Sequence, residues 1–524
     1  MELKLSSLKD ITCVKTPKYN VEEVIKNTKE NPIWLHFGAG NIFRGYIARL
    51  QDDLLNQGLC DKGIIAAETF DFEIIDQIYD AYDNLTMLAT LSATKPVDYR
   101  IVSSVVEGVK ASKVERLKEI IVNPSLQFIS FTITEKGYGL RGLDGEYLGI
   151  VKEDIKNGPA SAKHAMSVVC ALLHERYLNG KLPLAVVSMD NCSHNGEKLQ
   201  NSILTIANEW KTLGYVEEEF ISYLTDEAYI TFPWSMIDKI TPRPAESVEK
   251  EIEKLGFINM SPITTSKRTF IAPFVNAEVC EYLVIEDKFP NGRPSLEKAG
   301  VYLTSREIVN KVETMKVTTC LNPLHTALAV YGCVLGFDSI ASEMSCPELK
   351  KLVYGIGEEG MKVVVNPGII APEQFLSEVL NERLPNKAIP DTPQRIATDT
   401  SQKIVVRFGE TIKSYLKDEN LDVNGLIYIP LALAGWCRYL IGLNDNLEQF
   451  ELSADPMLEV LKAELKDVEI GKDNSIHLKN VLSNERVFGI NLYTTVLGEK
   501  VEGLFNELTA GKGAVIATLK KYVK

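Results

Sequence analysis

The stretch IWLHFGAGNIFRGYIARL, residues 33–50, decides the fold of the N-terminal half of this chain. Its apolar run 33–37 is typical of a buried β-strand, and the segment 42–55 has the apolar periodicity of an amphipathic helix. Gly38 and Gly40 form a G-x-G turn between them. Such glycines admit a pyrophosphate close to the backbone, and the helix N-terminus offers free N–H groups. A lone G-x-G also occurs in many tight turns. The prediction of a dinucleotide site therefore depends on the position of this motif between a strand and a helix.

Further strands and helices alternate through the first half of the chain. Apolar runs without helical periodicity predict strands, and longer periodic segments predict helices. This alternation favours a parallel sheet that helices cover on both faces. We expect an α/β, Rossmann-type N-terminal domain with a mostly parallel sheet, whose strands lie at 33–37, 63–69, 101–109, 126–134 and 182–190 and whose helices include 42–55 and 162–178.

The second half of the chain shows a different pattern. From about residue 300, helical periodicity dominates and strand-like alternation is rare, which predicts an all-α domain. The segment 285–294, IEDKFPNGRP, is rich in turn-forming residues and indicates a border. We therefore expect two domains, a Rossmann-type domain at 1–290 and an all-α domain at 291–524.

Polar residues at strand ends extend the expected cofactor site. Ligands of open α/β sheets bind beyond the carboxyl ends of the strands. Glu68 ends the second strand and is placed to accept from ribose hydroxyls; its charge would repel a 2′-phosphate, which favours NAD over NADP. Thr134 and Glu135 follow the strand at 126–134 and are expected to contact the cofactor. The structural alternatives are a solvated strand-end glutamate and loop caps.

Composition excludes several classes of protein. The 524 residues include 71 acidic and 57 basic side chains, a net charge of −14, so nucleic-acid binding is not expected. The chain lacks a long apolar run and an apolar N-terminal segment, so we expect no membrane span and no signal peptide. Nine cysteines without a CxxC pair predict buried thiols in a reducing cytoplasm. The six scattered histidines indicate no metal site.

Eight segments, in order along the chain, resemble one family, the polyol-specific long-chain dehydrogenases. That family includes mannitol 2-dehydrogenase, fructuronate reductase (mannonate oxidoreductase) and tagaturonate reductase. The matching segments are HFGAGNIFRG (36–45), TITEKGY (132–138), SMDNCSHNG (188–196), FPWSMIDKITP (232–242), VIEDKFPNGRP (284–294), MKVTTCLNPLHT (315–326), QRIATDTSQK (394–403) and LAGWCRYLIG (433–442).

The resemblance implies a metal-free, NAD-dependent oxidoreductase with its site between a Rossmann-type and a helical domain. It implies a catalytic set made of Lys316 as the general acid–base, with Asn191, Asn322 and His325 near the reacting oxygen. On the cofactor side, the first segment adds the contacts Asn41, Phe43 and Arg44. On the substrate side, it implies Asp238, Arg395 and Lys403.

These residue types suit the transfer of a hydride from a secondary alcohol. Without a metal, a lysine takes the alcohol proton only if burial or a nearby cation lowers its pKa, and Arg395 or Lys403 could supply that cation. The asparagine amides could donate to the developing alkoxide. The structural alternatives are Asn322 as a helix N-cap before a proline, His325 as a core histidine, and Lys316 as a solvated helix residue.

The spacing of the catalytic set departs from the family pattern. The family places the lysine eight residues before the histidine, whereas Lys316 stands nine residues before His325. On an α-helix a spacing of eight separates two side chains by about 80°, and a spacing of nine by about 180°. Pro323 also forbids the normal helical hydrogen bond. We therefore predict a helix break or a one-residue π-bulge between Lys316 and Pro323.

The expected substrate is a small linear polyol or sugar acid, and D-mannonate/D-fructuronate is favoured. A sugar acid needs a cationic pocket, which Arg395 and Lys403, with Arg407 or Lys413, could provide. The alternatives are mannitol–fructose interconversion, tagaturonate reduction, and a catalytically inactive NAD-binding protein. We expect a monomer or a small homo-oligomer without a nucleic-acid or membrane partner.

Overall fold

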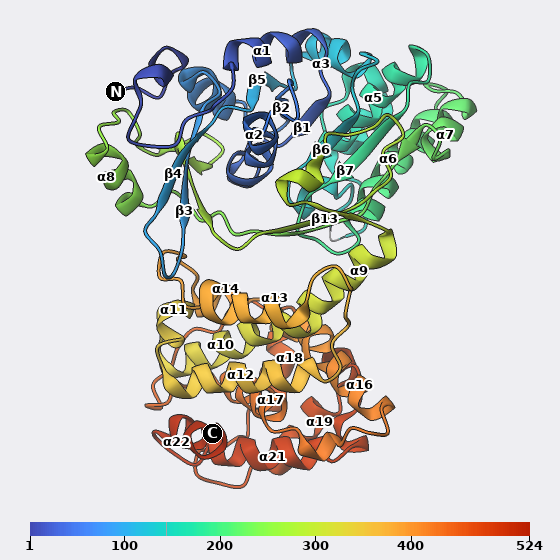
Figure 1. Cartoon of the computed structure of the whole chain (residues 1–524). Coiled ribbons are helices and arrows are strands. Elements are labelled where there is room, and N and C mark those ends of the chain that lie inside the picture. Colours follow the sequence, from blue (N-terminus) through green and yellow to red (C-terminus); the bar gives the residue numbers. More distant parts are fainter. Residues whose placement is uncertain (143) are drawn as a thin grey trace. The chain divides into compact units, whose positions relative to one another are not determined.

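The computed structural model describes residues 1–142 and 144–524 and divides them into two compact units (Figure 1). The first unit contains Met1–Leu91 and Lys95–Asn310, and the second contains Ser92–Thr94 and Lys311–Lys524. The first unit therefore extends beyond the expected border at residue 290. It does so because β14 (Tyr302–Thr304) pairs in parallel with β13 (Tyr282–Glu286).

A six-stranded sheet forms the centre of the first unit, and every neighbouring pair in it is parallel. The strand order β5-β2-β1-β6-β7-β8 places β1 and β6 side by side, with the chain proceeding outward on both sides of them. This is the topological switch point at which α/β sheets bind ligands. The predicted Rossmann-type fold is confirmed, with strands β1 (Trp34–Phe37), β2 (Ile64–Glu68), β5 (Val105–Lys110), β6 (Phe128–Phe131), β7 (Leu184–Ser188) and β8 (Ile230–Thr231).

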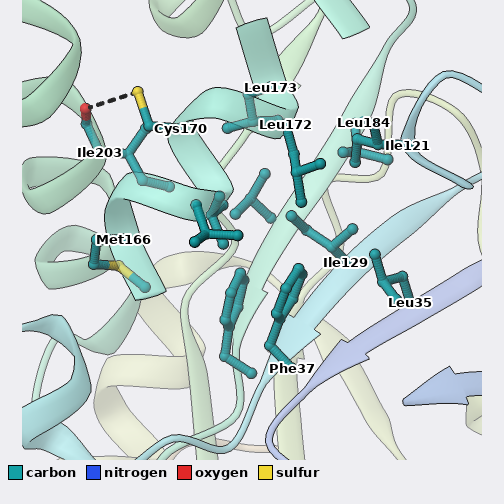
Figure 2. Close-up of a cluster of buried hydrophobic side chains, with 14 of the residues drawn as sticks. Leu35, Phe37, Ile121, Ile129, Met166, Cys170, Leu172, Leu173, Leu184 and Ile203 are labelled. Atoms are coloured by element: carbon teal, nitrogen blue, oxygen red, sulfur yellow. Dashed lines mark hydrogen bonds between the residues drawn. The ribbon is translucent and has the colours of Figure 1, made fainter. Parts of the chain in front are cut away.

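Alternating side chains bury both faces of this sheet. Leu35 and Phe37 contribute to one apolar cluster, in which α5 and α6 take part (Figure 2), while Trp34 contributes to the cluster that includes α2 on the other face. Full burial of each large apolar side chain stabilises the fold by about 1.5–3 kcal/mol. The α-helices of the first unit are α1 (Val21–Glu30), α2 (Ala48–Asn56), α3 (Val114–Ile121), α4 (Gly149–Asn157), α5 (Ala165–Leu178), α6 (Asn195–Thr212), α7 (Glu218–Thr225) and α8 (Glu246–Lys254).

Smaller sheets flank the main one, and the sequence patterns missed them. The single strand expected at 101–109 is two strands, because the buried Ser103 and Ser104 interrupt the run and bond elsewhere; Ser104 O accepts from Ile64 N–H at 2.8 Å. The first part pairs antiparallel within its own sheet. These additional strands are β3 (Thr86–Leu91), β4 (Asp98–Val102), β9 (Ser235–Asp238), β10 (Ile263–Thr264), β11 (Phe270–Ile271) and β12 (Phe274–Glu278).

The second unit is helical, as predicted, and no named strand occurs from residue 311 to residue 524, all of which the structure describes. Helix α9 (Arg306–Met315) enters it and continues as a π-helical turn, η8 (Lys316–Cys320). Two further π-helical turns are η9 (Val379–Arg383) and η10 (Val405–Gly409). The α-helices that follow are α10 (Asn322–Leu335), α11 (Ile340–Glu343), α12 (Pro347–Met361), α13 (Pro372–Glu378), α14 (Pro393–Ala397), α15 (Thr400–Ile404), α16 (Glu410–Lys417), α17 (Tyr428–Tyr439), α18 (Leu458–Glu464), α19 (Ser475–Leu482), α20 (Glu485–Phe488), α21 (Leu497–Leu508) and α22 (Ala514–Tyr522).

The composition predicts the absence of a membrane span, the absence of a metal site, and buried thiols. In the part of the chain that the structure describes, no helix is both long and apolar enough to cross a membrane. Among the same residues, no three His, Cys, Asp or Glu side chains are grouped so as to hold a metal ion. All nine cysteines are free thiols; five are buried, whereas Cys13 is exposed, so the prediction of buried thiols is correct for five.

Candidate active site

The turn after β1 contains two glycines, which differ in backbone conformation and in the space around them. Gly38 adopts φ +106°, and a Cβ there would lie 2.2 Å from the carbonyl oxygen of Thr132, so no other residue fits. A Cβ on Gly40 would meet nothing within 4 Å, which leaves the backbone open to an approaching group. Helical structure begins at Asn41, and the first helical bond runs from Arg44 N–H to Gly40 O at 3.1 Å. The N–H groups of the first turn are therefore available to an anion such as a pyrophosphate.

Glu68 stands at the predicted place, at the carboxyl end of β2, and it has a role that the sequence did not indicate. Its Oε2 accepts from Ala39 N–H at 3.0 Å, and its Oε1 accepts from the N–H groups of Phe70 and Asp71 at 2.8 and 3.2 Å. The carboxylate thus joins the glycine turn to the end of β2. Oε2 retains acceptor capacity for a hydroxyl, since a carboxylate oxygen has two lone pairs.

The side chains of Phe43 and Arg44 lie in the core, contrary to the expected cofactor contacts. Phe43 is fully buried and stacks on His36 at a centroid distance of 4.1 Å. The Arg44 guanidinium is 1% exposed and donates to the carbonyl oxygens of Ala272 and Phe274. Its burial lowers the pKa of Arg44 to about 10. Both side chains therefore hold the start of the helix against neighbouring elements. The Asn41 Oδ1, in contrast, is buried and has no hydrogen-bond partner in the part of the chain that the structure describes, so it is available to a donor of a bound cofactor.

The loop after β6 is held by a carboxylate that sequence reasoning did not single out. Thr134 has φ 65°, an uncommon conformation for a threonine. Asp190 accepts from the N–H groups of Ile133 and Thr134, both at 2.9 Å, and from the Tyr138 hydroxyl at 2.6 Å. Burial raises the pKa of Asp190, and these hydrogen bonds oppose the rise. The sequence feature that could have identified Asp190 is its position at the end of a predicted strand, beside Asn191.

The remaining candidates of the first unit lie near strand ends. Thr134 and Glu135 are exposed beyond β6, and Glu135 forms an ion pair with Lys198. Asn191 is exposed beyond β7, the neighbour of β6. Asp238 ends β9 and is 5% exposed. The structure thus collects Gly38, Thr134 and Asn191 at the carboxyl ends of adjacent parallel strands.

In the second unit, Lys316 begins the π-helical turn η8, so the predicted interruption of the helix is confirmed. Leu321 N–H donates to Lys316 O at 3.1 Å, a bond that spans five residues instead of four. The chain then breaks at Leu321, with φ −132° and ψ −61°, before α10 starts at Asn322. A π turn accommodates one residue more than an α-helical turn, which is the change that the long spacing between Lys316 and His325 requires.

Two structural alternatives for this segment are wrong. Lys316 is 3% exposed and is therefore no solvated helix residue. Asn322 is the first residue of α10; the N-cap position belongs to Leu321, whose side chain makes no capping bond.

His325 is oriented by an aspartate from a distant segment. Its Nε2 lies 3.0 Å from Oδ2 of Asp391, while Oδ1 of the same carboxylate accepts from Arg395 Nη2 at 2.5 Å and Nε at 3.0 Å. Burial of Asp391 disfavours its charge, but His325 and Arg395 outweigh that effect and hold the pKa of the carboxyl below its usual value. Asp391 was missed in the sequence, although its spacing of four from Arg395 is that of a helical ion pair.

The remaining basic candidates have separate partners. Lys403 Nζ donates to Thr398 O at 2.5 Å; burial and the neighbouring Arg407 lower the pKa of Lys403. Arg407 Nη1 donates to the Thr326 hydroxyl. Lys413 pairs with Glu410 and therefore contributes no uncompensated charge to a cationic pocket.

Family models match both units of this chain. The mannitol dehydrogenase Rossmann domain matches residues 32–298, and the mannitol dehydrogenase C-terminal domain matches residues 309–508. The chain belongs to the mannitol dehydrogenase family.

Family members of known name cover nearly the whole chain. D-mannonate oxidoreductase of Thermotoga maritima is 52% identical over 536 aligned residues, which is 100% of this chain and 99% of that protein. Mannitol 2-dehydrogenase of Phaeosphaeria nodorum is 27% identical over 88% of this chain and 77% of its own length. The structure of Pseudomonas fluorescens mannitol 2-dehydrogenase, a ternary complex with NAD and D-mannitol, shares the fold of this member of the family with a TM-score of 0.72, 24% identity and 99% coverage of both chains.

Proposed function

We propose that this chain is an NAD(H)-dependent oxidoreductase that interconverts D-mannonate and D-fructuronate in the cytoplasm. The observation that carries the proposal is the 52% identity, over the full length of both chains, to a D-mannonate oxidoreductase. The free thiols are consistent with a reducing compartment.

The residues at the glycine turn fit a dinucleotide. The open space over Gly40 and the free N–H groups of the helix start would receive the pyrophosphate, and Asn41 Oδ1 would accept a hydrogen bond from the cofactor. Glu68 would meet the adenosine ribose, and its negative charge disfavours a 2′-phosphate, so NAD is preferred. The nicotinamide supplies the hydride acceptor or donor when the cofactor is bound.

Lys316 moves the proton in this proposal. During oxidation its Nζ takes the proton of the reacting hydroxyl, and during reduction it returns a proton to the carbonyl oxygen. Burial of Lys316 keeps this transfer away from bulk water. The amide groups of Asn191 and Asn322 donate hydrogen bonds to the oxygen as negative charge develops on it.

His325 binds a neighbouring hydroxyl of the substrate. Asp391 engages Nε2 at 3.0 Å and so favours the tautomer with its proton on that nitrogen. Nδ1 is then an acceptor for a substrate hydroxyl, and the ring has a fixed orientation. The same carboxylate also holds Arg395, so the side chains of His325, Asp391 and Arg395 form one connected network.

The test is a panel of substrates offered in parallel to the purified protein with NADH: fructuronate, tagaturonate and fructose. We expect the fall in NADH absorbance to be fastest with fructuronate and to be slower when NADPH replaces NADH. A preference for fructose would instead support mannitol–fructose interconversion. The absence of turnover with every substrate would favour an inactive NAD-binding protein.

A further inference from the structure

Arg407 is a partly buried basic side chain of the second unit that has no ion pair and makes a single hydrogen bond among the residues that the structure describes. It lies in η10, and its one hydrogen bond within the described chain is the one from Nη1 to the Thr326 hydroxyl. Burial of the guanidinium lowers the pKa of Arg407 to about 10. A guanidinium carries five N–H donors, so most of its hydrogen-bonding capacity is left for another acceptor.

The neighbouring cations are compensated within the fold. Arg395 pairs with Asp391. Lys403 donates to a backbone carbonyl and experiences the charges of Asp399 and Asp455. Lys403 and Arg407 stand four residues apart and repel each other, since like charges at this spacing are unfavourable. The buried Arg438 has no ion pair among the described residues either, but it donates to three backbone carbonyls, whereas Arg407 has one protein acceptor in a chain with a net charge of −14. Burying an unpaired charge is costly, so such a group points to an anion from outside the chain.

Arg407 is also close to the candidate catalytic residues of its unit. Its element η10 packs against both η8, which begins with Lys316, and α10. Thr326, which receives its hydrogen bond, directly follows His325, and the Thr326 hydroxyl donates to Asn322 O at 2.9 Å. The guanidinium therefore lies within one helical turn of two residues that are expected to hold the substrate.

We propose that Arg407 binds the carboxylate of the sugar-acid substrate and thereby selects aldonates and keto-acids over neutral polyols. The inference rests on the proposed function and adds the residue that determines specificity. A planar guanidinium matches a carboxylate with two parallel N–H···O bonds. A neutral polyol presents a hydroxymethyl group in place of the carboxylate and would leave this charge unpaired, and a site built for a polar group discriminates strongly against an analogue that lacks it.

The experiment compares Arg407→Met and Arg407→Lys with the wild type and with Arg486→Met, which removes an exposed arginine of the same unit. Thermal unfolding first establishes that each variant is folded. We expect Arg407→Met to lower kcat/KM for fructuronate by about 100-fold and to change that for fructose by less than about threefold. Arg407→Lys keeps the charge but loses the two-bond geometry, so a loss of about tenfold is expected. Arg486→Met should behave as the wild type.

A binding measurement separates this inference from the proposed function. Mannonate and mannitol are titrated into each protein, with NADH present, and the shift in melting temperature is recorded. The wild type should respond to mannonate more than to mannitol, and Arg407→Met should lose that difference. Equal losses for acid and neutral ligands, or no loss in Arg407→Met, would overturn the role of Arg407. Selective binding of mannonate without any turnover would overturn the proposed activity alone.

Discussion

The two units bring candidate functional residues together by different means. In the first, Gly38, Thr134 and Asn191 follow the ends of β1, β6 and β7, three adjacent parallel strands. In the second, Lys316 begins a π-helical turn, and His325 follows it beyond a break at Leu321. A parallel sheet directs successive strand ends to one edge, so regular structure is sufficient there. Helices offer no such common edge, so a helical site depends on local irregularity and on partners from elsewhere in the chain.

This difference has a consequence for mutations. At the glycine turn, the proposed cofactor contacts use backbone N–H groups and open space, which most side-chain substitutions elsewhere leave in place. The proposed residues of the helical unit would act through their side chains, and the orientation of His325 depends on its contact with Asp391. Substitutions at five positions test the comparison.

The largest effect is expected for Lys316→Ala. Removal of the proposed acid–base should lower kcat with fructuronate by about 1,000-fold or more, since positioned proton transfer contributes about 100- to 10,000-fold. NADH binding, followed by fluorescence titration, should be unchanged because the residues proposed to bind the cofactor belong to the other unit. Lys466→Ala, at an exposed lysine, is the matched control. Retained turnover in Lys316→Ala would assign the proton transfer to another group.

The next effect concerns the orientation of His325. Asp391→Asn should lower kcat/KM by about 10- to 100-fold, a loss of the size found when a carboxylate that orients a metal-ligating histidine is removed. A purely structural role would appear as a fall in melting temperature with an unchanged kcat/KM. Asp391→Glu restores the charge and should recover part of the activity, which would connect the effect with the imidazole.

Substitutions of the two turn glycines, Gly38 and Gly40, should distinguish an effect on folding from an effect on cofactor binding. Gly38→Ala places a Cβ 2.2 Å from Thr132 O on a strained backbone and should destabilise the protein by about 2–4 kcal/mol. Gly40→Ala meets no protein atom within 4 Å and should leave the melting temperature unchanged, while weakening NADH binding by about tenfold, which corresponds to about 1.4 kcal/mol. If Gly40→Ala binds NADH as tightly as the wild type, the pyrophosphate does not lie at this turn.

The smallest effect is expected for a substitution of Glu343. It concerns the stability of the protein and not its catalysis. This carboxyl is fully buried without a hydrogen-bond partner among the described residues, and burial together with Asp391 raises its pKa to about 9. Between about pH 5 and 9 the folded protein thus keeps a proton that the unfolded chain releases, so stability falls as pH rises, by up to about 1.4 kcal/mol per pH unit.

Glu343→Gln removes that proton exchange. Urea unfolding at pH 6 and pH 8.5 should show a smaller loss of stability for this variant than for the wild type. Glu358→Gln, at an exposed glutamate of the same unit, should retain the wild-type slope. An identical slope in Glu343→Gln would show that its carboxyl is ionised in the folded protein.

Local patterns were sufficient for much of the fold. The apolar run before Gly38, the alternation of strands and helices, and the helical periodicity after residue 300 depend on near neighbours, and all three predictions hold in the structure. The nine-residue spacing of Lys316 and His325 together with Pro323 also sufficed to predict the interrupted helix, because helical geometry relates spacing to direction.

The tertiary structure alone decided which side chains meet across long stretches of chain. Nothing near Arg44 in the sequence indicates that its guanidinium binds the carbonyl oxygens of Ala272 and Phe274 in the core. The contacts of Asp190 with Thr134 and of Asp391 with His325 likewise come from the tertiary structure, as does the lack of an acid beside Arg407 among the described residues. Periodicity and turn residues depend only on neighbours in the sequence. The partner of a buried polar group, in contrast, can belong to any segment that packs around it.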